Sequence, residues 1–278
     1  MKKIGFIDYY LDEFHADKYP AWIEQATGGA MHVAYAYGLV DKKDGLSNEA
    51  WCAKQGIQLL DTIEEVVERS DYLVVLSPDH PEFHEELASI PLRSGKPTYV
   101  DKTFAPDRET AIRMFEWAEK HGTPMYSSSA LRFAKEYGEL EREGVNTIES
   151  WGAGQYDTYA IHQIEPIVQL MGPKPQKVMY TGTSKTPALL IDFGEGKQAS
   201  IHHLGQGCPF TLGVAYENGS SKIKRVESDF FFAFIQNMVK FFESGKPIVD
   251  SKETIAIITI IEYGREAAKH PFKWIELS

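Results

Sequence analysis

Short apolar runs alternate with helical patterns over the first 127 residues, and this alternation constrains the fold more than any other feature. The run DYLVVLSP (71–78) is continuously apolar and ends at a proline, as in a parallel strand covered on both faces. A helical pattern occupies 106–122, where Ala111, Phe115 and Ala118 share one face and Gly122 ends it. This order predicts right-handed βαβ units and a Rossmann-like doubly wound parallel sheet.

The other segments of this half follow the same two patterns. The segment DTIEEVVERS (61–70) has helical spacing, with Asp61 as the expected N-cap and Glu64 three residues later. A short apolar run at Ile4, Phe6 and Ile7 predicts the first strand. Further strands are predicted at 31–38, 96–102 and 123–129.

The second half of the chain has a different character. After a helical pattern at 131–144, its segments alternate in polarity or contain hairpin turns such as Gly194-Glu195-Gly196 and Asn218-Gly219. Helical patterns at 228–247 and 251–270 follow. We therefore expect a nucleotide-binding domain over 1–127 and, over 128–278, an α+β substrate and oligomerisation domain with an open, mostly antiparallel sheet.

Composition narrows the classes of partner. The 29 basic and 40 acidic residues give a formal charge of −11, which argues against nucleic acid and anionic membranes as partners. The longest apolar run, 255–261, is too short to span a bilayer, and the first residues lack the apolar core of a signal peptide. Cys52 and Cys208 cannot build a disulfide framework. These features predict a cytoplasmic protein that acts on a small molecule.

Three segments resemble the Gfo/Idh/MocA oxidoreductases, the family of glucose–fructose oxidoreductase and inositol dehydrogenase. Residues 74–105 are similar to that family's strand ending in Thr-Pro-Asn, its following histidine and its Glu-Lys-Pro. YAIHQIEPIVQLMG (159–172) resembles the family's Gly-x-His-x-x-Asp helix. Residues 234–268 resemble its two last helices in pattern and spacing. The three segments come in the family's order, so the chain resembles a divergent member.

The resemblance implies hydride transfer between NAD or NADP and a sugar, a polyol or a related hydroxylated small molecule. It also implies that His162 is the acid/base and that Lys102 is the cation that holds the substrate oxygen. The implied cofactor-binding residues are Asp8, Ser77, Pro78, Asp79, His84, Asp101 and Lys102. The implied substrate-binding residues are Lys102, Thr158, His162 and Glu165.

The chain departs from the family pattern at the cofactor loop and beside the histidine. A dinucleotide fold has a glycine-rich turn after its first strand, whereas residues 8–13 read DYYLDE. We expect Asp8, Asp12 and Glu13 to lie in a solvated loop. The family's aspartate four residues before the histidine is Thr158 here, and Asp157 is one position out of register.

Several candidates also have ordinary structural explanations. Lys102 could reach solvent at a strand end, as most lysines do. His162 could pack against its own helix with Glu165 as a surface partner, although Pro166 favours a first helical turn that faces a loop. In a strand, His202 and His203 would point to opposite faces.

No metal is predicted. His15, His80 and His84 lack the spacing that defines a metal site.

Three hypotheses about function follow from the sequence. The leading one is an NAD(P)-dependent oxidoreductase. The alternative is a non-catalytic binding or regulatory relative that has lost the cofactor site. A third, an enzyme of another class that retains a nicotinamide, has no support of its own in the sequence. Separately, an open sheet with apolar residues on its outer face predicts a homodimer or larger oligomer.

Overall fold

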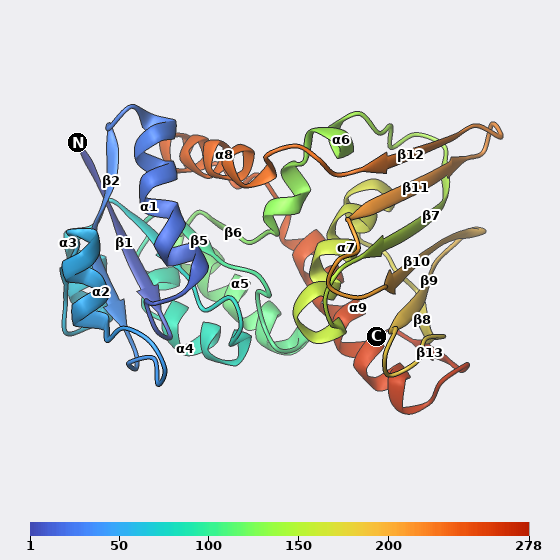
Figure 1. Ribbon diagram of the computed structural model, residues 1–278, viewed down its shortest axis with the longest axis horizontal. Coiled ribbons are helices and arrows are strands. Elements are labelled where there is room, and N and C mark those ends of the chain that lie inside the picture. The colour runs from blue at the N-terminus through green and yellow to red at the C-terminus, as the bar shows by residue number, and fades with distance from the viewer. Residues whose placement is uncertain (278) are drawn as a thin grey trace. The chain divides into compact units, whose positions relative to one another are not determined.

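The computed structural model describes residues 1–277, which form two compact units (Figure 1). The first unit contains Met1–Ser128 and Phe232–Asp250, and the second contains Ser129–Phe231 and the chain from Ser251 onward. The first unit's main segment thus ends one residue beyond the expected boundary at 127. Residues 232–250 differ from the prediction, because they belong to the first unit and not to the second.

A six-stranded sheet forms the centre of the first unit. Its strands lie in the order β3-β2-β1-β4-β5-β6, and every neighbouring pair is parallel. This confirms the predicted Rossmann-like sheet. The strands are β1 (Lys2–Asp8), β2 (Met31–Gly38), β3 (Gln58–Leu59), β4 (Tyr72–Val75), β5 (Thr98–Val100) and β6 (Met125–Tyr126).

Helices connect these strands, and their ends follow the expected capping chemistry. The helices are α1 (Phe14–Thr27), α2 (Asn48–Gln55), α3 (Ile63–Arg69), α4 (His84–Ala88) and α5 (Arg108–His121). Helix α5 begins after Asp107 and ends at Gly122, whose φ is 64°. The predicted N-cap Asp61 of α3 is wrong by one residue. Thr62 caps the helix by accepting from the Glu65 amide, and Glu65 accepts from the Asp61 amide in return.

Helix α8 (Phe230–Ser244) contributes aromatic side chains to the first unit. The Phe234 ring lies 5.7 Å from Tyr19 of α1 and 5.3 Å from Tyr99 of β5. Further along the helix, Phe242 stacks on Tyr72 of β4 at 4.9 Å. These aromatic contacts explain why the segment belongs to the first unit although it is distant in sequence.

The second unit is built on a seven-stranded sheet. The strand order is β12-β11-β7-β10-β9-β8-β13, and only the β7–β10 pair is parallel. This confirms the predicted open, mostly antiparallel sheet. The strands are β7 (Val145–Gly152), β8 (Lys177–Tyr180), β9 (Ala188–Gly194), β10 (Lys197–His203), β11 (Thr211–Tyr216), β12 (Ser221–Arg225) and β13 (Trp274–Glu276).

Two long helices, α7 (Tyr156–Met171) and α9 (Ser251–Lys269), pack on each other and on this sheet (Figure 1). Both predicted hairpin turns are present, between β9 and β10 and between β11 and β12. The predicted helix at 131–144 is wrong. That segment contains a 3₁₀ turn at Ala130–Phe133 and only one α-helical turn, α6 (Lys135–Gly138). The Glu136 carboxylate there binds Ser228 instead, so tertiary contacts override local propensity.

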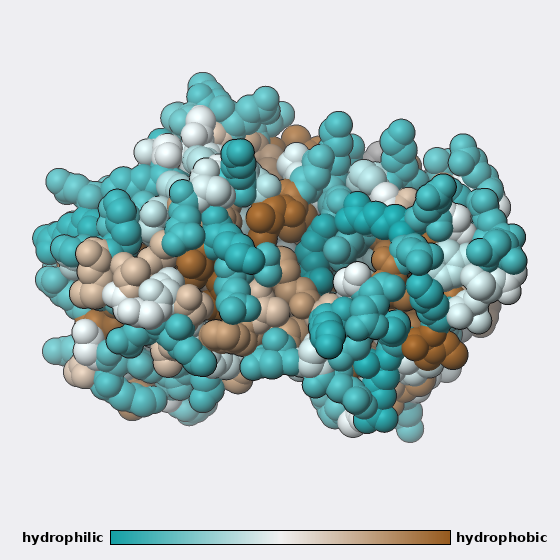
Figure 2. Space-filling view, turned by 90° about the horizontal axis from the view of Figure 1, so that it is seen from above, coloured by the Kyte–Doolittle hydropathy of each residue, from teal (hydrophilic) through white to brown (hydrophobic). Residues whose placement is uncertain are grey.

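Polar side chains dominate the face drawn in Figure 2, where hydrophobic residues form separate patches. Two of the exposed hydrophobic side chains, Ile223 and Trp274, lie on the second unit's sheet. The homo-oligomer stays a prediction. Within residues 1–277, none of the helices is long and apolar enough to cross a membrane.

We predict that Phe234→Ala lowers the free energy of unfolding by about 3–5 kcal/mol, because it removes a fully buried ring and leaves a cavity. Chemical denaturation followed by tryptophan fluorescence measures this. Phe272→Ala is the matched control, since Phe272 is 71% exposed. An equal loss in both variants would contradict the packing of α8 against α1 and β5.

Candidate functional site

Lys102 lies at the carboxyl edge of the first unit's sheet, two residues after the end of β5. Its side chain is buried, since the residue is only 8% exposed, and its Nζ donates to the Pro78 carbonyl at 3.0 Å. Within residues 1–277, Lys102 forms no salt bridge. The alternative of an ordinary solvent-exposed lysine is therefore wrong.

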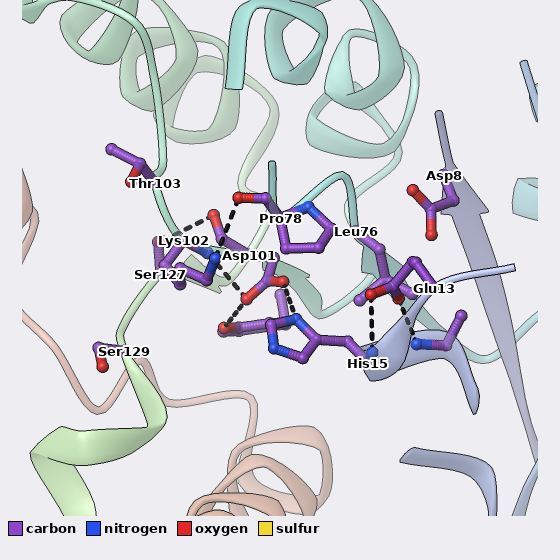
Figure 3. Close-up of polar contacts among 12 residues, drawn as sticks. Asp8, Glu13, His15, Leu76, Pro78, Asp101, Lys102, Thr103, Ser127 and Ser129 are labelled. Carbon is purple, nitrogen blue, oxygen red and sulfur yellow. Dashed lines mark hydrogen bonds and ion pairs between the residues drawn. The ribbon is translucent and has the colours of Figure 1, made fainter. Parts of the chain in front are cut away.

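The neighbouring Asp101 carboxylate is fully buried and bonds to several groups of the same unit (Figure 3). Its Oδ2 lies 2.5 Å from Nδ1 of His15, a residue in the first turn of α1. Its Oδ1 accepts from the Tyr99 hydroxyl at 2.9 Å and from the Lys102 amide at 2.8 Å. Asp101, predicted as a cofactor-binding residue, thus joins the end of β5 to the start of α1.

Each partner shifts the pKa of the other. Burial opposes ionisation of Asp101, but His15 and then Lys102 outweigh it and lower the pKa of Asp101 to about 2. Burial also disfavours the charged form of His15, and the Asp101 carboxylate outweighs that effect and raises the pKa of His15 above its usual 6.5. Both shifts favour the charged forms, so the two side chains form a buried ion pair at pH values below the raised pKa of His15.

The loop after β4 faces the same edge of the sheet. Ser77 and Pro78 come shortly after Val75, the last residue of β4. The Ser77 hydroxyl donates to the His80 carbonyl at 2.9 Å. Asp79 is exposed. These three predicted cofactor-binding residues therefore lie at the carboxyl ends of the strands, where open α/β sheets bind ligands.

His84 does not fit its predicted cofactor-binding role. It is fully buried at the start of α4, as expected for the helix after β4. Its Nε2 lies 2.6 Å from the Leu76 carbonyl, and its Nδ1 lies 3.0 Å from that of Thr103. With no exposed surface, His84 joins the loop after β4 to the loop after β5 and has a structural role.

The β1–α1 turn is not the solvated loop that we expected. Asp8 is 1% exposed, and Glu13 is half-buried. The Glu13 carboxylate caps α1 by accepting from the amides of His15, at 2.7 Å, and Ala16. Burial raises the pKa of Glu13 to about 7. Burial and then the nearby Glu13 raise the pKa of Asp8 well above its usual value.

These residues do not fit the pyrophosphate of a dinucleotide. In the dinucleotide fold, free amides at this helix terminus hold the phosphates, whereas here Glu13 occupies two of them. The cavity at the turn has a volume of about 10 Å³, room for one water-sized group, and is lined by Asp8, Glu13 and Asp79 among others. Ligand sites usually measure roughly 300–1,000 Å³. Gly5 does not supply the missing glycine, because its lack of a side chain lets β1 approach Val66 and Ser70.

In the second unit, His162 lies in the middle of α7 and not in its first turn. Helix α7 begins at Tyr156, so Pro166 is inside the helix and does not mark its start. The His162 Nδ1 lies 2.7 Å from the Ser129 hydroxyl, and the ring packs edge-on against Tyr159 and Phe210. The Ser129 hydroxyl and these two rings therefore hold the imidazole in place.

The positions flanking His162 differ in their surroundings. Thr158 is half-buried on α7, one turn before His162. Its neighbour Asp157 is exposed and pairs with Arg265 of α9 at 2.8 Å. Asp157 therefore joins two helices and does not orient His162.

Glu165 is buried and does not have its predicted role of contacting substrate. It accepts from the Ser129 amide at 2.5 Å and pairs with Arg132 at 3.3 Å. Arg132 also pairs with Glu253 of α9 at 2.5 Å. Burial raises the pKa of Glu165 to about 7 against the opposing effect of Arg132. We assign this ion-pair network a structural role.

Sequence reasoning did not find His15 or Arg132. The topology of the fold offered one indication for His15, because the first turn of α1 and the residue after β5 meet at the same edge of a parallel sheet. His203 is buried, with its Nδ1 3.2 Å from the Ala153 carbonyl, and His202 is half-buried. Within residues 1–277 there is no cluster of three or more metal-ligating side chains.

The fold is that of several solved dehydrogenases. A probable dehydrogenase from Thermotoga maritima matches with a TM-score of 0.82 at 13% identity, over 99% of this chain and 98% of that one. Myo-inositol 2-dehydrogenase from Lactobacillus plantarum matches with a TM-score of 0.80 at 14% identity, over 100% and 99%. GenD2 from gentamicin A biosynthesis, in complex with NAD, matches with a TM-score of 0.76 at 13% identity, over 100% and 97%.

These matches cover both units of the chain. They confirm the predicted likeness to inositol dehydrogenases and related Gfo/Idh/MocA-type oxidoreductases at the level of fold. No protein-family model and no curated protein matches the sequence.

We predict that the imidazole of His15 titrates above pH 6.5, and that Asp101→Asn lowers this midpoint by removing the adjacent charge. Because the pKa of folded His15 is raised, the pair's contribution to stability is complete below pH 6.5 and is lost as pH rises through the raised pKa. Because the pKa of Asp101 is lowered, the same contribution is also lost as pH falls through about 2.

Histidine ring resonances measured by NMR, with His15→Gln for assignment, give the titration midpoint. Asp71→Asn is the control, because Asp71 pairs with Lys2 at the opposite edge of the sheet. A wild-type midpoint below 6.5, or no change in Asp101→Asn, would refute the ion pair.

Proposed function

We propose that the protein binds a sugar, a polyol or a related hydroxylated small molecule at Lys102, and that it does so without a dinucleotide at the β1–α1 turn. In this proposal it is a binding or regulatory protein on an oxidoreductase fold.

The Lys102 ammonium supports the binding of a hydroxylated molecule. A lysine has three N–H donors, and within residues 1–277 only one hydrogen bond uses them, the bond to Pro78. A charge with so little exposure is stable only with polar partners. Lys102 lies at the carboxyl edge of a parallel sheet, where ligands of this architecture bind. Ligand hydroxyl oxygens would satisfy the remaining donors.

The Glu13 carboxylate supports the absence of a dinucleotide. The Glu13 carboxylate already neutralises the positive end of α1. Asp8 lies near this carboxylate. A pyrophosphate would have to displace one carboxylate and lie beside another in a poorly solvated cavity, which is electrostatically unfavourable.

An NAD- or NADP-dependent oxidoreductase is the second candidate, and the fold favours it. The similar structures include dehydrogenases of inositols and one protein with NAD bound, and these likenesses support an oxidoreductase. In this candidate Lys102 holds the substrate oxygen, and His162, oriented by Ser129, exchanges the hydroxyl proton. The dinucleotide would need a mode of binding that does not use the amides of α1.

We predict no saturable binding of NADH or NADPH up to about 1 mM, the upper end of ordinary Michaelis constants. Energy transfer from the five tryptophans to the reduced nicotinamide measures this binding. Binding in the micromolar range, followed by oxidation of a polyol, would refute the proposal and establish the oxidoreductase.

We also predict that any inositol or sugar found to bind by calorimetry loses about tenfold to hundredfold in affinity in Lys102→Met, because a charged hydrogen bond is lost. The control is Lys54→Met, since Lys54 is an exposed partner of Asp17. Equal affinity in wild type and Lys102→Met would refute the role of Lys102 independently of the result with NADH.

A further inference from the structure

The cavity at the carboxyl ends of β1 and β4 contains an unsatisfied acid. Asp8 ends β1, and its Oδ1 accepts from the Tyr9 amide at 2.7 Å. The Ser77 amide also lies near this carboxyl group, but Oδ2 is buried and has no hydrogen-bond partner of good geometry within residues 1–277. Asp8 lines the cavity, and Figure 3 shows its carboxyl group beside Glu13. A buried carboxyl oxygen without a partner destabilises the folded state, and a hydrogen-bond donor on a ligand would remove that cost.

The side chains that line the cavity determine whether its ligand is an anion or a cation. Its lining includes the carboxyl groups of Asp8, Glu13 and Asp79 and, among the described residues, no lysine or arginine. The one histidine of the lining, His80, lies 3.3 Å from the Glu82 carboxylate through its Nδ1. In their ionised forms these acids repel an anion and attract a cation.

Two tyrosine rings in the lining indicate that the cation is an organic ammonium group and not a metal ion. Tyr9 and Tyr10 both line the cavity, with ring centroids 5.5 Å apart. The Nζ of Lys42 lies 5.3 Å from the Tyr10 centroid, so this ring already accepts an ammonium group from the chain itself. Aromatic faces combined with carboxylates are typical of ammonium recognition. Metal-ligand clusters of three or more residues do not occur within residues 1–277.

We propose that this cavity binds a primary ammonium group, so that the ligand of the protein is a hydroxylated amine. The ammonium group donates to Asp8 Oδ2 and Glu13 and lies against the tyrosine rings. Pro78 connects the two parts of the site, because it lines the cavity and its carbonyl accepts from Lys102. The amine of the ligand thus occupies the acidic cavity, and its hydroxyl groups contact Lys102. The second half of this statement rests on the proposed function.

The raised pKa values of Asp8 and Glu13 agree with this assignment. Burial raises the pKa of Glu13 to about 7 and raises that of Asp8 above its usual value, so both acids hold a proton more strongly than ordinary carboxyl groups do. An incoming cation favours their ionised forms, so binding should release a proton. Calorimetry in two buffers of different ionisation enthalpy measures this release.

Methylammonium chloride is the probe, because it contains the ammonium group alone. We expect saturable amide shifts in NMR spectra at Tyr9–Glu13 and Ser77–His80, which equal concentrations of potassium chloride do not produce. Asp8→Asn and Glu13→Gln should each weaken the affinity at least about tenfold, because each removes one charged acceptor. Asp71→Asn should leave the affinity unchanged, since Asp71 lies at the other edge of the sheet.

The proposal is overturned by the absence of a saturable shift, by the same shift with potassium, or by unchanged affinity in both Asp8→Asn and Glu13→Gln. Saturable shifts of the same amides with sodium pyrophosphate would overturn it as well, because the turn would then accept phosphate. Lys102→Met separates this inference from the proposed function. The Lys102→Met variant should bind methylammonium as the wild type does. If Lys102 has no role in binding hydroxyl groups, the ammonium site is therefore unaffected.

Discussion

The buried carboxylate of Asp101 organises the carboxyl edge of the first unit's sheet. It draws together the imidazole of His15 from α1, the hydroxyl of Tyr99 from β5 and the backbone of Lys102. A buried carboxylate is tolerated only when such partners satisfy it, so its neighbours are fixed in turn. Lys102 follows directly and reaches the Pro78 carbonyl beyond β4. The position of the candidate ligand-binding ammonium therefore depends on an ion pair made by its neighbour.

The β1–α1 turn inverts the charge that this architecture usually presents. A helix N-terminus attracts an anion, and here the anion is the chain's own Glu13. The cap satisfies the helix, so the fold does not need a phosphate at this place. The same cap brings Glu13 close to Asp8 and leaves an acidic cavity with one unsatisfied oxygen. The proposed recognition of a cation in place of a phosphate therefore depends on side chains at the turn and not on the order of the strands.

The sequence predicts the two sheets well because their signals are local. Continuous apolar runs mark strands buried on both faces, and the sequence shows the glycines and asparagine of the hairpin turns. The short helix at Lys135–Gly138 could not be predicted, because Glu136 bonds to Ser228, which is 92 residues away. His15 and Asp101 are 86 residues apart, and their pairing likewise has no local signal. Glu165 resembled a ligand-binding acid in sequence, but its burial with Arg132 depends on tertiary packing.

In this chain, the residues that stabilise the fold differ from those that would contact a cofactor. The first sheet is stabilised by buried apolar side chains such as Ile4, Phe6 and Val74, whereas the residues that would meet a dinucleotide lie at the ends of the strands. Substitutions at the strand ends leave the hydrophobic core intact, so a sheet of the same order can exist with opposite charge at its edge. The similarity at 13% identity over nearly the whole length therefore reflects the arrangement of the core, whereas the chemistry of the site depends on Asp8, Glu13 and Lys102.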